Sequence, residues 1–225
     1  MRIVFWQNCL SPHQLPYIAR LMDDERVESV AVVAGEAVSG ARRQMGWELA
    51  AHEGLDRCAV YVAPHDVLID RLLEERPQDT WHLFSGIRGF AFVFKVLARS
   101  MGRNLHRGLI TERPFTYARG LADGKPLWMH QLRFALQDRP FARGIQAVFA
   151  MGDEAVDYFR RVWKDWQVFP FAYCTERAQV PSAAPAEGAC RFAFVGQLSP
   201  RKAPMDVLRA YRILTKSNGG GSLTS

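Results

Sequence analysis

The sequence predicts an α/β protein with a mostly parallel sheet and helices on both of its faces, as in a Rossmann-like, doubly wound fold. Short apolar runs alternate along the chain with longer amphipathic segments. No two neighbouring apolar runs are joined by a tight hairpin turn, so successive strands need helical crossovers. With 225 residues, 48% of them hydrophobic, the chain can bury one core of generous size.

Seven apolar runs are expected to form the strands. Each is short, and most end at a glycine or a polar residue. Gly35 ends the second run, and Gly86 begins the turn after the fourth. In chain order the expected strands cover residues 2–6, 29–34, 59–63, 80–85, 107–111, 146–151 and 167–171.

Helices are expected between these strands. Pro126 near the start of one and Pro140 after its end are typical helix boundaries. Ser11 and Gln14 have the spacing of a capping box at the start of the first helix. In chain order the expected helices cover residues 13–24, 65–75, 89–101, 127–138 and 153–163.

The composition changes after residue 176, where we expect the first domain, residues 1–176, to end. Residues 177–189 contain two prolines and no apolar periodicity, which is typical of a linker. Residues 190–214 have the pattern of a strand, a glycine turn and an amphipathic helix, and residues 215–225 of a flexible tail. One strand and one helix cannot bury the core of a second domain, so we expect that domain to be truncated in this chain.

Composition limits the classes of partner. The net charge of +6 favours an anionic partner, namely a phosphorylated ligand, an anionic membrane surface or nucleic acid. Nucleic acid ranks last because no zinc-finger, homeodomain or RNP pattern is present. No apolar run is long enough for a signal peptide or a spanning helix, so we expect a cytoplasmic protein, soluble or peripheral on the inner face of the membrane.

The cysteines do not suggest a metal site. None of the four has metal-ligand or CxxC spacing, so we expect neither zinc nor dithiol chemistry, and no metal. They are expected to be free thiols in a reducing compartment. The four are Cys9, Cys58, Cys174 and Cys190.

Polar residues follow several of the expected strands, where open α/β sheets bind their ligands. Glu112 is the sharpest candidate, because a carboxylate there could bind or deprotonate a hydroxyl group of a substrate. A surface ion pair with Arg113 or Arg119 is the alternative, just as helix capping is the alternative for the serines. The candidates in the loops after the first and fourth strands are Ser11, His13, Gln14, Ser85 and Gly86.

The helix expected from residue 89 has a basic face and no carboxylate nearby. Its core face is expected to carry Phe90, Phe94, Leu97 and Met101. An aromatic residue between like charges is typical of an interfacial membrane anchor, and an ordinary solvated helix face is the alternative. The residues of this candidate membrane contact are Arg88, Phe92, Lys95, Arg99 and Arg103.

The segment 196–202 is a candidate phosphate site. Gly196 allows close approach to the backbone, and Lys202 brings positive charge to the start of a helix. Gln197 lies between them. The spacing is neither that of a Walker A loop nor that of a GxGxxG fingerprint.

Several of these segments, in order, resemble bacterial family 4 glycosyltransferases that build surface polysaccharide. The resemblance is carried by SPHQ at 11–14, SG at 85–86, ITERP at 110–114, AMGDEAVDYF at 150–159, VFPFAY at 168–173 and FVGQLSPRKAPMDVLRAY at 194–211. It implies a GT-B fold, in which an N-terminal Rossmann-like domain binds the acceptor and a second domain binds a nucleotide-sugar. It also implies transfer of the sugar with retention and without an obligatory metal or other cofactor.

The resemblance assigns roles to the candidate residues. Ser11, His13, Gln14, Ser85 and Gly86 would border the glycan or lipid-linked acceptor, with Glu112 as a catalytic candidate. Gly196, Gln197 and Lys202 would face the donor diphosphate.

The sequence also departs from the family pattern. Gln197 replaces the usual arginine, Ala203 the usual glycine, and Glu112 a frequent histidine. The E-x7-E segment that holds nucleotide and sugar is absent from this chain, so we expect the chain alone to transfer little or no sugar and its C-terminal half to be missing. Two alternatives remain, a non-catalytic module that docks to an anionic membrane or a partner subunit, and an unrelated Rossmann-type nucleotide enzyme.

Overall fold

The computed structural model describes residues 1–38, 40–44, 57–113, 127–174, 192–194 and 202–217. The chain divides into two compact units, and each is described by itself. The first comprises Met1–Phe115 and Pro126–Ala178, and the second Thr116–Lys125 and Gln179–Ser225.

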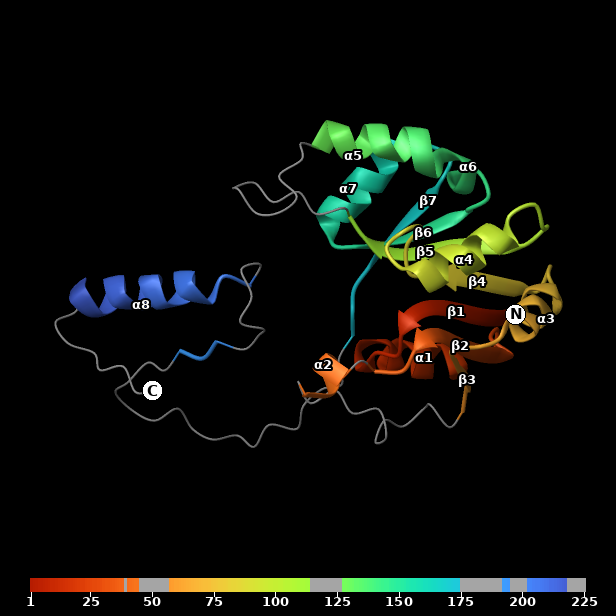
Figure 1. The fold of residues 1–225 in the computed structure, drawn as a ribbon, viewed down its shortest axis with the longest axis horizontal. Helices are drawn as coiled ribbons and strands as arrows, with labels where there is room; N and C mark the ends of the chain where they lie inside the picture. Colours follow the sequence, from red (N-terminus) through yellow and green to blue (C-terminus); the bar gives the residue numbers. More distant parts are fainter. Residues whose placement is uncertain (39, 45–56, 114–126, 175–191, 195–201, 218–225) are drawn as a thin grey trace. The chain divides into compact units, whose positions relative to one another are not determined.

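The first unit is built on a seven-stranded sheet in which every neighbouring pair of strands is parallel (Figure 1). Its strand order is β3-β2-β1-β4-β5-β6-β7, which is the doubly wound order with one strand added at the edge. The strands are β1 (Arg2–Cys9), β2 (Ser29–Glu36), β3 (Ala59–Val62), β4 (Thr80–Phe84), β5 (His106–Glu112), β6 (Ala147–Met151) and β7 (Gln167–Phe171). All seven expected strands are therefore confirmed, and so is the Rossmann-like fold class.

Helices follow most of the strands, as the alternating pattern predicts. None of the described helices is long and apolar enough to cross a membrane. The helical segments of the first unit are η1 (Pro12–Gln14), α1 (Leu15–Met22), α2 (Gly40–Gln44), α3 (Asp66–Glu74), α4 (Ala91–Ser100), α5 (Leu127–Arg133), the π-helical turn η2 (Phe134–Asp138), α6 (Arg139–Ala142) and α7 (Asp153–Val162).

The two faces of the sheet contribute to separate apolar clusters. One face, with Trp6, Leu109 and Val148, packs against buried side chains of α3, α4, η2, α6 and α7. The other face, with Phe5 and Ile110, packs against Ile18 of α1. Because successive residues of a strand point to opposite faces, β1 is buried on both sides and lies at the centre of the core.

Two predictions about helix ends are wrong. The Ser11 side chain caps no helix, and the Gln14 side chain instead donates a hydrogen bond to Gln7 in the interior. The helix expected to end before Pro140 continues through η2 into α6, with Pro140 in the first turn of α6. The register changes at this turn, so the N–H that proline lacks is not required there.

The core face predicted for α4 is also partly wrong. Its buried residues are Val93, Val96, Leu97 and Ser100, with the spacing i, i+3, i+4, i+7. Phe90 precedes the helix in an extended conformation and is 41% exposed. Phe94 is half-buried because the Phe141 ring and the guanidinium of Arg88 cover it.

In the second unit the described residues form one helix, α8 (Pro204–Ser217). Part of the strand predicted at the start of residues 190–214 can be checked, because residues 192–194 are described, and these are not in a strand. A strand needs a neighbouring strand for its backbone hydrogen bonds, and the described part of this unit contains no strand that could pair with residues 192–194.

His82 of β4 is a buried imidazole without a charged partner. Its Nδ1 accepts a hydrogen bond from Trp6 Nε1 at 3.2 Å, and its Nε2 has no partner among the described residues. Burial, and next the positive charge of Arg107, lower the pKa of His82 to about 3. The folded protein therefore holds this side chain neutral at every ordinary pH.

We expect this imidazole to make the fold acid-sensitive. The unfolded chain binds a proton at His82 below its ordinary pKa of about 6.5, whereas the folded chain does not until about pH 3, so stability falls across that interval as the pH is lowered. Between about pH 7.5 and pH 5 the loss from this group is about 2 kcal/mol. Urea unfolding of wild type and His82→Asn measures it, and equal pH dependence of the two proteins would contradict the assignment.

Candidate functional site

The candidate site lies at the carboxyl edge of the sheet, around the boundary between β1 and β4. From β1 the chain continues to β2 on one side, and from β4 it continues to β5 on the other. The loops after these two strands therefore diverge, and open α/β sheets bind ligands at such a topological switch point. The five residues predicted to contact an acceptor lie in these two loops.

In the loop after β1, two of the three predicted residues remain partly accessible. Ser11 and His13 are half-buried, and the His13 ring lies 6.0 Å from the ring of Tyr173. Gln14 is buried, where its side-chain amide donates to the buried Gln7 of β1. Gln14 therefore holds the loop against the strand, while Ser11 and His13 stay at the edge.

In the loop after β4, Ser85 and Gly86 form a tight turn. Ser85 N–H donates to Trp6 O at 3.1 Å, and Gly86 adopts a φ of 86°, the left-handed region that favours glycine. The Ser85 hydroxyl is buried and has no hydrogen-bond partner among the described residues. Its hydrogen-bonding capacity is therefore available to a ligand or to water.

Glu112 ends β5 at the same edge and is exposed. Arg113, the ion-pair partner considered above, pairs with Glu154 instead, and Arg119 lies outside the described residues. Glu112 lines two neighbouring cavities of about 260 Å³ and 440 Å³. The smaller one also contacts the Gly86 turn and the Tyr158 ring of α7, so it joins the loops after β4 and β5.

The structure adds residues that the sequence analysis missed. Desolvation, and next the carboxylate of Glu112, raise the pKa of Tyr173, which follows β7. The positive charge of Arg42 lowers this pKa, and Cys9 raises it. Arg42 of α2 donates a hydrogen bond to Cys9 Sγ at the end of β1. These groups come from segments far apart in the sequence, and no motif connects them.

The candidate membrane contact on α4 is largely ion-paired. Lys95 Nζ lies 2.7 Å from Asp66 Oδ1, Arg99 pairs with Asp66 and Asp70, and Arg103 lies 3.1 Å from Asp70 Oδ1. The acidic residues all belong to α3, which repeats a carboxylate at each turn beside the basic turns of α4. The row of cations on α4 is therefore balanced by its neighbour.

Arg88 and Phe92 of the same prediction are also held by the protein. Arg88 Nε donates to Asp138 Oδ1 at 2.5 Å, and Arg88 Nη2 donates to Gln137 O at 2.8 Å. Phe92 packs half-buried against the core, so close to Gly35 that a Cβ there would lie 2.7 Å from Phe92 Cβ. Membrane contact through these residues stays a prediction. The basic face on which it rested is paired with carboxylates in the described structure.

Of the predicted diphosphate-binding residues, Lys202 alone is described. Gly196 and Gln197 lie outside the described residues. Lys202 is exposed and precedes α8, and Ala203 between them has a φ of 48°. The positive charge of Lys202 thus lies near a helix start, as the sequence predicts.

The carboxyl edge of the first unit presents hydroxyl, imidazole and carboxylate groups, which are suited to hydrogen bonds with a polar ligand. The described residues contain no cluster of three or more His, Cys, Asp or Glu side chains that could hold a metal ion.

No family model, no curated protein and no solved structure matches the chain.

We expect substitution of Arg99 to destabilise the helix pair rather than to alter membrane binding. Arg99→Glu places a third carboxylate beside Asp66 and Asp70 and removes two ion pairs of a partly exposed side chain, so the free energy of unfolding should fall. Urea unfolding measures this loss, and sedimentation with phosphatidylglycerol vesicles measures membrane binding.

The matched control is Arg160→Glu on α7, where the arginine is exposed and forms no ion pair among the described residues. This control makes the same change of charge and should leave the unfolding free energy nearly unchanged. Loss of vesicle binding in Arg99→Glu alone, with stability unchanged, would instead favour the membrane contact.

Proposed function

We propose that the first unit is the acceptor-binding domain of a retaining glycosyltransferase that uses a nucleotide-sugar and acts on a cell-surface polysaccharide or glycolipid. The observation that carries the proposal is the pair of loops at the switch point. They bring the Ser85 hydroxyl, His13 and Ser11 to the boundary of β1 and β4, with Glu112 on the next strand. Hydroxyl, imidazole and carboxylate groups are suited to hydrogen-bonding the hydroxyl groups of a sugar.

The composition of the first loop argues against the rival nucleotide enzyme. A dinucleotide-binding sheet of this strand order places a pyrophosphate on a glycine-rich turn directly after β1. Here residues 8–14 contain no glycine, and Pro12 removes a backbone N–H at the start of η1. This loop therefore lacks both the space and one of the donors that a pyrophosphate would need.

Within the proposed reaction each part has a distinct task. Lys202 and the neighbouring start of α8 would stabilise the negative charge that develops on the departing diphosphate, together with Gly196 and Gln197. Glu112 would bind or deprotonate the attacking hydroxyl of the acceptor. The resemblance of residues 194–211 to the donor loop of family 4 glycosyltransferases supports this division of roles.

The test is a comparison of ligand classes by saturation-transfer NMR on the full chain. We expect oligosaccharides to receive saturation and NAD to receive none. Ser85→Ala and Glu112→Gln should each weaken oligosaccharide binding about tenfold, because the first removes a hydrogen bond of a buried hydroxyl and the second removes the charge that strengthens a hydrogen bond.

Glu25→Gln is the matched control, because Glu25 is exposed and far from this edge in the fold, beside the start of β2. It should leave oligosaccharide binding unchanged. Clear NAD binding that competes with the oligosaccharide would overturn the proposal in favour of the nucleotide enzyme.

A further inference from the structure

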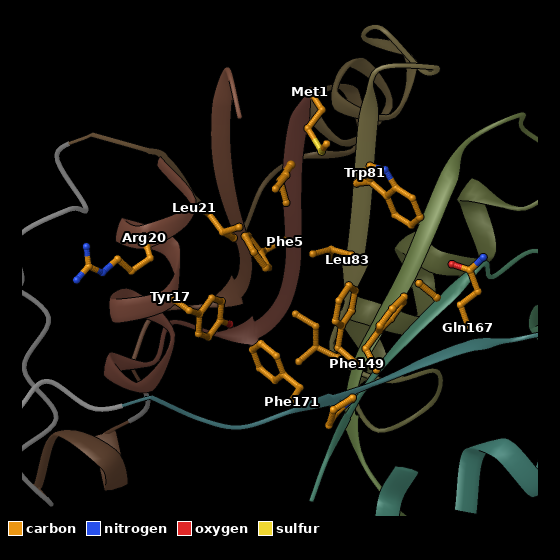
Figure 2. A pocket seen from close by; sticks show the side chains of 15 residues that line it. Met1, Phe5, Tyr17, Arg20, Leu21, Trp81, Leu83, Phe149, Gln167 and Phe171 are labelled. Atoms are coloured by element: carbon orange, nitrogen blue, oxygen red, sulfur yellow. The ribbon is translucent and has the colours of Figure 1, made fainter. Parts of the chain in front are cut away.

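Within the part of the chain that the structure describes, one face of the sheet is covered by fewer helices than the other. All-parallel sheets are normally covered on both faces, because their strands are apolar on both sides. Helices α3, α4, α6 and α7 contribute to the cluster on one face, whereas α1 is the only described helix in the cluster on the other. Over β1 and β4 to β7 this second face carries a groove of about 660 Å³ (Figure 2).

Ala147 is a small residue in the floor of this groove, and Gly108 lies beside it on the neighbouring strand. Gly108 and Ala147 are partners in the register of β5 and β6, so both belong to this face. A Cβ at Gly108 would lie 2.7 Å from Leu83 Cδ2, which favours glycine there. Large side chains stand around this floor, from Trp81 on β4 to Phe149 on β6 (Figure 2).

The walls of the groove are aromatic and in mutual contact. The Phe149 ring stacks on Phe169 with centroids 5.6 Å apart, and the Tyr17 ring of α1 meets Phe171 edge-on at 5.3 Å. Phe169 is 44% exposed, although it belongs to this apolar surface. The groove therefore offers a ligand contact with ring carbons rather than with hydrogen-bonding groups.

The few polar groups of the lining select the head group of a ligand. Among the described residues that line the groove, Arg20 carries the only charged side chain, the α-ammonium of Met1 is a second cation, and none is a carboxylate. The Arg20 side chain is 87% exposed, projects outward from α1 (Figure 2), and lies 3.9 Å from Asp23, a long ion pair. The rim thus favours an anion that stays in water, while the floor favours hydrocarbon.

The shape of the groove favours a flexible chain over a second copy of the protein. The groove volume lies within the range of sites that bind small molecules. A flat protein face resting on Tyr17 and Phe169 would leave part of the groove volume between them unfilled, and such a void forfeits contacts. A hydrocarbon chain can lie along the floor and fill this volume.

We propose that this groove binds the acyl chain of an anionic amphiphile, with the head group at Arg20. The proposal does not depend on the proposed glycosyltransferase function, because it rests on the face of the sheet that carries the groove and not on the carboxyl edge. The groove ends at Tyr17 and Phe171, close to the carboxyl edge, where Tyr173 contacts His13.

The probe for the test is 11-(dansylamino)undecanoic acid, whose fluorescence rises in an apolar site. We expect saturable binding of one probe per chain. Ala147→Leu, which fills the floor, and Phe169→Ser, which removes an exposed wall, should each weaken binding about tenfold. Because Phe169 is 44% exposed, its substitution keeps the test valid even where Ala147→Leu disturbs the sheet.

The matched control is Phe90→Ser, which removes an equally exposed phenylalanine, 41% accessible, from outside the groove. It should leave probe binding unchanged. Decanoate should displace the probe from wild type better than decylamine, and Arg20→Gln should remove this preference. Absence of saturable binding, an equal loss in Phe90→Ser, or a dimer by light scattering that Phe169→Ser dissociates would each overturn the proposal.

Discussion

The hydrogen bond from Trp6 to His82 joins β1 to β4 in the interior. At this boundary the chain stops adding strands on one side of the sheet and begins to add them on the other. Both side chains are fully buried, and their rings stack with centroids 6.1 Å apart. The register of Arg2 with Thr80 and of Trp6 with Phe84 aligns the carboxyl ends of the two strands. The two loops of the candidate site are thereby held beside one another, although some 70 residues of chain lie between them.

Many charged side chains of the first unit form ion pairs or hydrogen bonds within the protein. The cations of α4 pair with α3, and the buried guanidinium of Arg107 donates to the carbonyl groups of Ser100, Arg103 and Leu105, which follow one another at the end of α4 and after it. A buried cation that meets several carbonyl dipoles at a helix end is stabilised without a carboxylate. The net charge of +6 already leaves out the cations that pair with carboxylates, whereas Arg107, which is buried among carbonyl groups, counts toward it without being accessible to a ligand.

The carboxyl edge and the face that carries the groove are chemically different surfaces of one sheet. The edge presents hydroxyl and carboxylate groups around Ser85 and Glu112, whereas the face presents aromatic rings. They approach each other at Phe171, the last residue of β7, and at Tyr173, which lies two residues later. If both proposals hold, a lipid-linked acceptor could place its chain on the face and its sugar at the edge.

The sequence by itself determined the fold class and the positions of the seven strands of the described sheet, because alternation of short apolar runs with amphipathic segments is a local signal. It also placed Ser11, Ser85, Gly86 and Glu112 at strand ends, since a strand end is recognised from a few neighbouring residues. Tertiary structure alone decided which helix face was buried, as at Phe94, and which charges were paired, as at Arg99 with Asp70. It alone brought Tyr173 near Glu112 and formed the groove beside Phe169, because such contacts join residues distant in the chain, and no periodicity within one segment encodes its partners in another.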